Sequence, residues 1–269
     1  MFRTCAIGDF VVNLPALVAL SRSHPDSRFT LVGNPSTLAL ARPFVDVEAI
    51  GSIDSPAWRR LYHSPADGLE FDRAIVWSKD PAIALNLRRS GIPDVLHADP
   101  FPTDRHAADH LLATWRLPPP ELPDLWRAGS DHIILHPGSG SAKKNWPHFL
   151  ELAERLGNAQ FLIGPAESNF DTERFRRIEA LSLSDVFELL RIARTFVGND
   201  SGITHLAAYL GCPTIAIFTS TDPVIWGPIG RRVRILQSPV VSEVARLLSE
   251  LPSWNRRGGL APRKTDPFL

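Results

Sequence analysis

The sequence predicts an α/β protein of two Rossmann-like, doubly wound parallel-sheet domains that face each other across a cleft. Short apolar strand-like runs alternate with helical patterns along most of the 269 residues, which is typical of βαβ units. A proline-dense stretch at residues 117–124 interrupts this alternation, because neither a strand nor a helix continues through it. Two glycine-containing turns follow predicted strands in the second half. These three observations together define the fold class.

The first domain, residues 1–120, contains four predicted strands, each followed by a predicted helix. The runs rich in β-branched and apolar residues predict strands at residues 2–7, 28–32, 73–77 and 94–97. The intervening helical patterns cover residues 14–23, 36–42, 82–89 and 106–115. Strands joined in this way through helices form a parallel sheet.

The second domain, residues 128–251, restarts the alternation after the linker. Its predicted strands are residues 132–135, 160–163, 195–197, 214–218 and 233–236. Its predicted helices are residues 147–156, a segment around 172–177, 184–193, 203–210 and 240–251. Residues 252–269 contain prolines, a glycine pair and four basic residues against one acidic, and predict a flexible or loosely docked basic tail.

Composition excludes several classes of protein. Lys and Arg total 29, as do Asp and Glu, which argues against nucleic acid as a partner. Cys5 and Cys212 lie in separate halves without a CxxC motif, so we expect free thiols in a reducing compartment. The chain shows neither a signal-peptide pattern nor an apolar run long enough to span a bilayer. We therefore expect a cytoplasmic protein, with at most peripheral contact between the basic tail and the inner face of the membrane.

The most informative segment is residues 198–208, a polar turn with two glycines between a buried strand and a helix. Such a turn presents free N–H groups and the positive end of the helix dipole to an anion. Residues 133–147 form a second strand and turn of this kind, in which Gly138, Ser139 and Gly140 precede Lys143 and Lys144. This turn matches neither the G-x-G-x-x-G nor the P-loop fingerprint. Two anion-binding turns in one domain predict a diphosphate site.

Several polar residues follow predicted strands, where open parallel sheets bind their ligands. Asp9 is expected in the turn between a strand ending at Ile7 and a helix beginning near Asn13, and either it caps that helix or it serves as a general base. Glu167 is either a surface residue or a ligand of ribose hydroxyls, and Asp200 either caps the following helix or belongs to the site. Ser201, Thr204 and His205 are expected to donate hydrogen bonds to phosphate or sugar. The chain has no Asp-x-Asp pair, so we expect no metal and assign the phosphate charge to N–H groups, a helix dipole and lysine.

Four segments of the chain resemble the heptosyltransferase-like glycosyltransferase family 9, whose members have the GT-B fold. They are residues 6–17, residues 136–140 with 144–147, residues 164–167, and residues 198–208 with 218–223. The segments occur in the order in which the family has them and cover most of residues 1–230.

The resemblance implies a metal-independent inverting glycosyltransferase of lipopolysaccharide biosynthesis. It would move a heptose-like sugar from an ADP-linked nucleotide-diphospho-sugar, without a further cofactor, to a hydroxyl of a glycan or glycolipid acceptor. By position, Asp9 would be the catalytic base, and Lys144 would stabilise the departing diphosphate. Glu167 would hold the ribose, and Asp200 would lie near the sugar. The implied donor-binding residues are His136, Gly138, Ser139, Gly140, Lys144, Glu167, Asp200, Ser201, Gly202, Thr204 and His205.

Two alternatives stay open at this point. One is a non-catalytic nucleotide-sugar-binding protein with a reduced acceptor domain, and the other is a sugar-nucleotide epimerase. The first half of the chain carries 12 basic and 15 acidic side chains over residues 1–125. We therefore expect an acceptor that is neutral, or less phosphorylated than the usual acceptor of the family.

Overall fold

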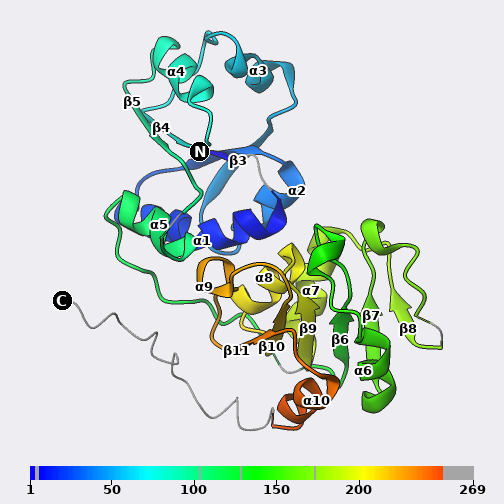
Figure 1. Ribbon diagram of the computed structural model, residues 1–269. Coiled ribbons are helices and arrows are strands. Elements are labelled where there is room, and N and C mark those ends of the chain that lie inside the picture. Colours follow the sequence, from blue (N-terminus) through cyan, green and yellow to red (C-terminus); the bar gives the residue numbers. More distant parts are fainter. Residues whose placement is uncertain (4–5, 103, 128, 173, 251–269) are drawn as a thin grey trace. The chain divides into compact units, whose positions relative to one another are not determined.

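The computed structural model describes all residues except 4–5, 103, 128, 173 and 251–269 (Figure 1). The basic tail, and the part of the first predicted strand at residues 4–5, therefore lie outside the described residues. The chain forms two compact units. The first unit comprises Met1–Glu121 with Val224–Trp226, and the second comprises Leu122–Pro223 with the chain from Gly227 onward.

The first unit contains a five-stranded parallel sheet in the order β3-β2-β1-β4-β5. Its strands are β1 (Phe2–Arg3), β2 (Phe29–Gly33), β3 (Val47–Ser52), β4 (Arg73–Trp77) and β5 (Asp94–Ala98). The order reverses between β1 and β4, which makes the carboxyl ends of these two strands the switch point of the sheet.

Five helices of the first unit connect or flank these strands. They are α1 (Ile7–Ser23), α2 (Pro35–Leu38), α3 (Pro56–Arg59), α4 (Ala82–Arg89) and α5 (Ala107–Thr114), with short 3₁₀ turns η1 (Ala39–Ala41) and η2 (Arg60–Tyr62). A further helical turn, α9 (Pro223–Trp226), contributes Val224–Trp226 to this unit. Phe2 and Val76 belong to a buried apolar cluster on one face of the sheet. The helix α1 is buried from Phe10 to Leu20.

The structure differs from the sequence-based prediction at three points in this unit. The helix α1 begins at Ile7 rather than near Asn13, so Asp9 lies inside the helix and not in a preceding turn. Burial of the largely apolar segment that follows Asp9 stabilises the longer helix and offsets the hydrogen bond that Pro15 cannot donate. The strand β3 was not predicted, because it lies at the edge of the sheet and carries an exposed Glu48. The turn α3 was not predicted either.

The second unit contains a six-stranded parallel sheet in the order β11-β10-β9-β6-β7-β8. Its strands are β6 (Ile133–His136), β7 (Ala159–Leu162), β8 (Arg176–Ile178), β9 (Thr195–Asn199), β10 (Thr214–Phe218) and β11 (Val233–Gln237). Counted within the unit, this is the 3-2-1-4-5-6 order of dinucleotide-binding sheets, and its switch point lies between β6 and β9.

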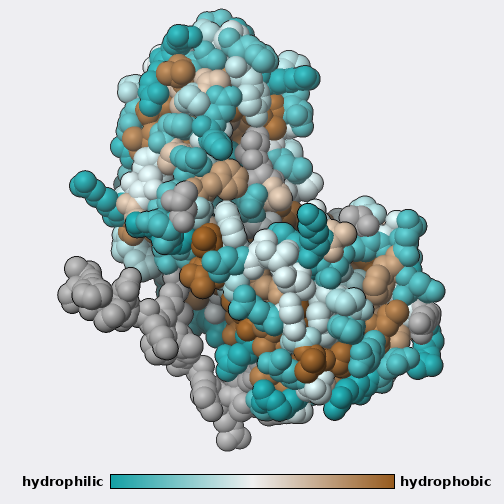
Figure 2. Space-filling view, viewed as in Figure 1, coloured by the Kyte–Doolittle hydropathy of each residue, from teal (hydrophilic) through white to brown (hydrophobic). Residues whose placement is uncertain are grey.

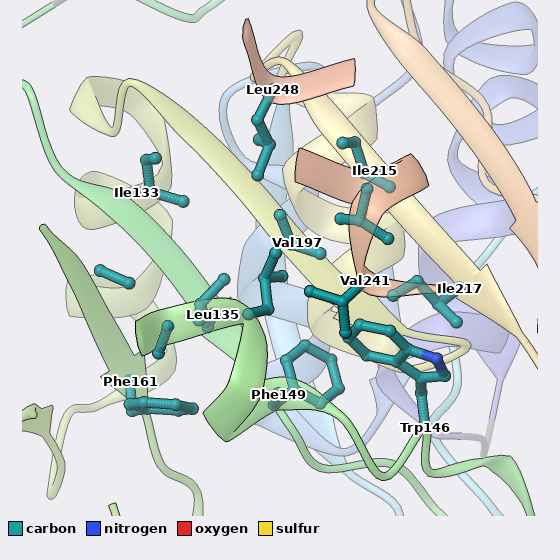
Figure 3. Close-up of a cluster of buried hydrophobic side chains, with 14 of the residues drawn as sticks. Ile133, Leu135, Trp146, Phe149, Phe161, Val197, Ile215, Ile217, Val241 and Leu248 are labelled. Atoms are coloured by element: carbon teal, nitrogen blue, oxygen red, sulfur yellow. The ribbon is translucent and has the colours of Figure 1, made fainter. Parts of the chain in front are cut away.

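The helices of the second unit cover an apolar core. They are α6 (Phe149–Leu156), α7 (Leu183–Ile192), α8 (Gly202–Tyr209) and α10 (Val241–Ser249), with 3₁₀ turns η3 (Ala142–Lys144) and η4 (Pro165–Glu167). Figure 3 shows side chains of β6, β9 and β10 packed together with Trp146, Phe149 and Val241. This core fixes the sheet edge from which the loops of the unit extend.

The predicted helix around residues 172–177 is wrong. Residues 176–178 form the edge strand β8, which pairs with β7, and the Thr172 hydroxyl donates to the Phe175 carbonyl in the turn before it. Main-chain pairing with β7 decides the conformation of this short polar segment, and that pairing leaves no periodic signal in the sequence.

Among the described residues, every helix is too short or too polar to cross a membrane. In the view of Figure 2, hydrophilic residues occupy much of the visible surface of each unit, and hydrophobic residues occur between them in smaller groups.

Candidate functional site

The candidate site of the second unit lies at the carboxyl ends of β6 and β9, where the strand order reverses. The loop at residues 137–146 follows β6 and carries Lys144, and Asp200 and Ser201 follow β9. Ligands of open α/β sheets bind at this edge. The two turns that the sequence singled out are therefore neighbours in the structure, because β6 pairs directly with β9.

The helix α8 begins at this edge. Ser201 is its N-cap, and the Ser201 hydroxyl accepts a hydrogen bond from the N–H of Thr204 at 3.3 Å. The Thr204 hydroxyl in turn donates to the Asn199 carbonyl at 2.5 Å. The N–H groups of Gly202 and Ile203 are among those for which a helix has no internal acceptor. Together with the helix dipole, they form a site that favours an anion.

Lys144 and Asp200 form an ion pair across the two loops. The Lys144 Nζ lies 2.7 Å from the Asp200 Oδ2, and their side chains are 30% and 6% exposed. The Thr221 hydroxyl donates to the same oxygen at 2.6 Å, and the His205 Nε2 lies 3.6 Å from the Oδ1. The sequence predicted Lys144, Asp200 and His205 as site residues, and the structure brings them together.

The charge state of Asp200 follows from these neighbours. Burial alone would raise the pKa of the Asp200 carboxyl, but His205, Lys144 and Thr221 stabilise the carboxylate and hold the pKa well below its usual value. Asp200 is thus ionised at neutral pH, and its carboxylate contacts Lys144 of the loop at residues 137–146. His205 is buried, and among the described residues its Nδ1 has no hydrogen-bond partner.

Asn199, the last residue of β9, holds both ends of the loop that carries Lys144. Its Nδ2 donates to the Pro137 carbonyl at 2.7 Å, and its Oδ1 accepts the N–H of Trp146 at 2.9 Å. The Trp146 indole N–H donates to the Pro239 carbonyl at 2.9 Å, and its ring lies in the core shown in Figure 3. The loop is therefore anchored at both ends.

Sequence reasoning assigned no role to Asn199 or to Thr221. The available signal for Asn199 was a polar amide at the end of an apolar strand, since such a buried group needs partners. Thr221 follows β10 by three residues and gave no such signal, because its partner Asp200 is 21 positions away.

Glu167 lies against the loop that follows β6. Its Oε2 accepts the N–H of Gly164 at 3.1 Å, and a Cβ on Gly138 would overlap the Glu167 carboxylate. Gly138 is thus required for the close approach of this carboxylate to the loop. The His136 Nδ1 lies 2.9 Å from the Leu162 carbonyl. Burial lowers the pKa of His136, although the hydrogen bond to Leu162 and the charge of Glu167 oppose this effect.

Ser139 and Gly140 differ in what they offer to a ligand. The Ser139 hydroxyl lies 2.6 Å from both the Ser141 carbonyl and the Asn145 Oδ1, so the loop itself uses this side chain. Open space surrounds Gly140, where an added Cβ would meet no atom within 4 Å. The loop backbone at Gly140 is therefore accessible.

Asp9 lies in the first turn of α1 in the first unit and is half-buried. The N-cap of this helix is Ala6, without a side-chain cap, so neither Asp9 nor Asn13 caps it. The Asp9 carboxylate forms no hydrogen bond or ion pair with any residue that the structure describes. Asn13, one turn further on the same helix face, is buried, and its Nδ2 has no partner among these residues.

The described parts of the chain contain no group of three or more His, Cys, Asp or Glu side chains arranged to hold a metal ion. Cys212 is buried, and burial raises the pKa of its thiol. Cys5 lies outside the described residues.

Comparisons with known proteins identify the family and the fold of the chain. Residues 104–247, more than half of the chain, match glycosyltransferase family 9 (heptosyltransferase). Lipopolysaccharide heptosyltransferase 1 of Pseudomonas aeruginosa is 33% identical over 116 residues, which is 38% of this chain and 33% of that protein. The matched part thus spans about a third of the length of that relative.

Two solved structures are similar over nearly the whole chain. The E. coli heptosyltransferase WaaC with ADP has a TM-score of 0.73 and 18% identity, covering 93% of this chain and 98% of that one. The E. coli ADP-heptose lipopolysaccharide heptosyltransferase II has a TM-score of 0.77 and 18% identity, covering 95% and 98%. Two parallel α/β units with these neighbours define a protein of the GT-B fold. Within that class, the chain belongs to glycosyltransferase family 9.

Proposed function

We propose that this protein is an inverting, metal-independent glycosyltransferase of lipopolysaccharide biosynthesis. It transfers a heptose-like sugar from an ADP-linked donor to a hydroxyl of a glycan or glycolipid acceptor. Family membership supports the reaction class, and the similar heptosyltransferase described with ADP supports the choice of nucleotide. We further propose that it works in the cytoplasm, with at most peripheral contact with the membrane.

The observation that carries the proposal is the anion site at the switch point of the second unit. Lys144 and the N-terminal N–H groups of α8 lie at the same sheet edge, and Gly140 leaves the loop backbone accessible. A diphosphate binds there through charge-assisted hydrogen bonds. The same groups stabilise the negative charge that develops on the leaving diphosphate, so the reaction needs no metal for this purpose.

Donor contacts follow from the positions of the remaining side chains. Glu167 accepts hydrogen bonds from ribose hydroxyls beside Gly138, and Asp200, Thr204 and His205 lie near the sugar and the diphosphate. His136 supports the loop through its contact with Leu162. Ser139 acts through its backbone, since its hydroxyl is engaged within the loop.

Asp9 is the proposed catalytic base of the first unit. Its carboxylate has no partner among the described residues, so it is free to accept the proton of an acceptor hydroxyl. As that proton leaves, the oxygen bonds to the anomeric carbon, and the bond between that carbon and the diphosphate breaks with inversion.

The test is transfer by the Asp9→Asn variant. We expect the rate to fall about 10²- to 10⁴-fold, the usual contribution of general-base catalysis, while the affinity for ADP stays unchanged. The control is Asp26→Asn, which removes an exposed carboxylate from the same unit. Unchanged transfer by Asp9→Asn would remove Asp9 from the mechanism. Product formation with an acceptor panel separates this function from a non-catalytic binder, and donor turnover without acceptor would indicate an epimerase.

A further inference from the structure

A buried arginine that has no counter-charge among the described residues lies at the sheet edge of the first unit. Arg3 is the last residue of β1 and is only 4% exposed. Its Nη1 donates to the Trp77 carbonyl at 3.4 Å, and its Cζ lies 5.6 Å from the centre of the Phe101 ring. Among the described residues, Arg3 has no carboxylate partner, and its Nε has no acceptor.

The position of Arg3 is the one at which this type of sheet binds ligands. β1 and β4 flank the point where the strand order reverses, and Arg3 and Trp77 are their last residues. The register pairs Phe2 with Val76, so Arg3 lies beside Trp77. Phe2 and Val76 belong to the apolar cluster on one face, which places Arg3 and Trp77 on the other face.

Trp77 adds a second donor that has no acceptor in the part of the chain that the structure describes. Its side chain is buried, and its indole Nε1 has no hydrogen-bond partner within the described chain. Buried polar groups in folded proteins are nearly always paired, and an unpaired buried charge is especially unfavourable. Two neighbouring residues of one sheet face thus each carry a donor that is unpaired within the described chain, and one of these donors is a cation; this points to a missing acceptor with negative charge.

We propose that the first unit binds a single carboxylate or phosphate group at Arg3, with the Trp77 N–H as a second donor. Building on the proposed function, we assign this group to the sugar acceptor. One guanidinium in a half that has more acidic than basic residues suits an acceptor with one anionic group at this point. Phe101, whose ring lies against the guanidinium, is itself 44% exposed, so Arg3 packs beneath a side chain that reaches the surface.

The binding test uses inorganic phosphate and acetate as probes and measures the thermal unfolding midpoint of the full chain. We expect the midpoint of the wild type to rise with one or both anions, relative to sodium chloride at equal ionic strength. A larger rise with acetate would indicate a site for a carboxylate, and a larger rise with phosphate would indicate a site for a phosphate group. The rise should be clearly smaller in Arg3→Gln, which keeps only the anion site at Lys144 and α8, and unchanged in Arg60→Gln, which removes an exposed arginine of the same unit.

Two results would overturn the proposal: no anion-specific rise in the wild type, or an equal rise in Arg3→Gln. If Arg3→Gln does not fold, Trp77→Phe decides, since it removes the N–H and keeps a buried ring. A weaker response to the anions in Trp77→Phe supports the site, and an unchanged response contradicts it.

The transfer test compares two acceptors that differ only in one carboxylate or phosphate. Arg3→Gln should raise KM for the anionic acceptor at least tenfold and leave KM for the neutral acceptor and for the donor unchanged. An equal effect on both acceptors would contradict the assignment to the acceptor. Absence of transfer by the wild type would count against the proposed function, while the response to phosphate and acetate would still decide whether Arg3 binds an anion.

Discussion

The ion pair between Lys144 and Asp200 affects how strongly the second unit binds an anion. In the structure, the ammonium that we assign to the diphosphate is already neutralised by a carboxylate that is 6% exposed. A nucleoside diphosphate must therefore share Lys144 with Asp200 or displace it. The cost of this competition is electrostatic, because the two anions approach the same cation.

Replacement of Asp200 by Asn should tighten ADP binding. The substitution keeps hydrogen-bonding groups for Thr221 and Lys144 but removes the competing negative charge. We expect the dissociation constant for ADP to fall about three- to tenfold at low salt, and the gain to shrink as salt screens the charges. Titration calorimetry at two salt concentrations measures both effects. Weaker binding at both concentrations would mean that Asp200 assists the nucleotide rather than competes with it.

Protonation of His136 should contribute to acid sensitivity. Burial lowers the pKa of His136 in the folded state, below the value of 6.5 that applies to an unperturbed histidine. As the pH falls through about 6.5, His136 becomes protonated in the unfolded chain but stays neutral in the folded chain. The free energy of unfolding therefore decreases. The decrease levels off once the pH is below the lowered pKa, because His136 is then protonated in both states.

Urea unfolding between about pH 7.5 and about pH 5.5, roughly one unit on each side of an ordinary histidine pKa, tests this effect. The decrease in the free energy of unfolding should be smaller in His136→Gln than in the wild type. His132→Gln, which removes an exposed histidine of the same unit, should behave like the wild type. Identical pH profiles for His136→Gln and the wild type would contradict the burial argument.

At the scale of elements, the loop between β6 and α6 is organised by a side chain of a different strand. Asn199 of β9 bonds to Pro137 and Trp146, and Lys144 lies between these two points. The loop thus holds its lysine in place before a ligand arrives, which reduces the entropy lost on binding.

Asn199→Ala should weaken ADP binding through Lys144. The substitution leaves the Pro137 carbonyl and the Trp146 N–H without partners, at a cost of about 1–3 kcal/mol for each buried group. We expect a loss of about tenfold in ADP affinity in the wild-type background, and a clearly smaller loss when Lys144→Gln is already present. Equal losses in both backgrounds would show that Asn199 supports the fold without positioning Lys144.

Elements with strong local signals were predicted well. The segment at residues 82–89 is α4, and residues 214–218 are β10, because helical periodicity and a continuous apolar run identify them. The edge strands β3 and β8 were missed or wrongly predicted, since their stability comes from pairing with a neighbouring strand. The start of α1 was also wrong, because the prediction continued a strand to Ile7 and placed Asp9 in a turn after it, whereas the helix begins at Ile7.

The candidate site was predicted as residue types but not as a network. Turn chemistry identified the loops that carry Lys144 and Asp200, yet their ion pair joins positions 56 residues apart. Asn199, Thr221 and Arg3 act through partners that are distant in sequence, and a single sequence has no local signal for such contacts.

At the scale of the whole molecule, two parallel sheets each carry polar groups at a switch point. The second unit offers cationic and N–H groups, and the first offers the Asp9 carboxylate, which has no partner among the described residues, and a buried guanidinium. This division agrees with a protein that takes a diphosphate donor on one unit and an acceptor on the other. It also predicts that substitutions in the second unit change donor binding without changing acceptor binding, and that substitutions in the first unit do the reverse.

Chelation should leave the proposed reaction intact. Positive charge for the leaving diphosphate comes from Lys144 and the N-terminus of α8, so an excess of EDTA should change the transfer rate by less than about twofold. Addition of Mg²⁺ after EDTA is the control. A large loss of transfer that Mg²⁺ restores would contradict the metal-independent mechanism.

Lys144 and the N-terminus of α8 are proposed to bind a nucleoside diphosphate. Calorimetric titration with ADP tests this binding most directly. We expect one ADP per chain, an affinity at least about tenfold weaker in Lys144→Gln, as loss of a charge-assisted hydrogen bond implies, and wild-type affinity in Lys143→Gln. The neighbouring Lys143 is exposed and is therefore a matched control. Absence of ADP binding, or equal affinity in Lys144→Gln and the wild type, would contradict the account.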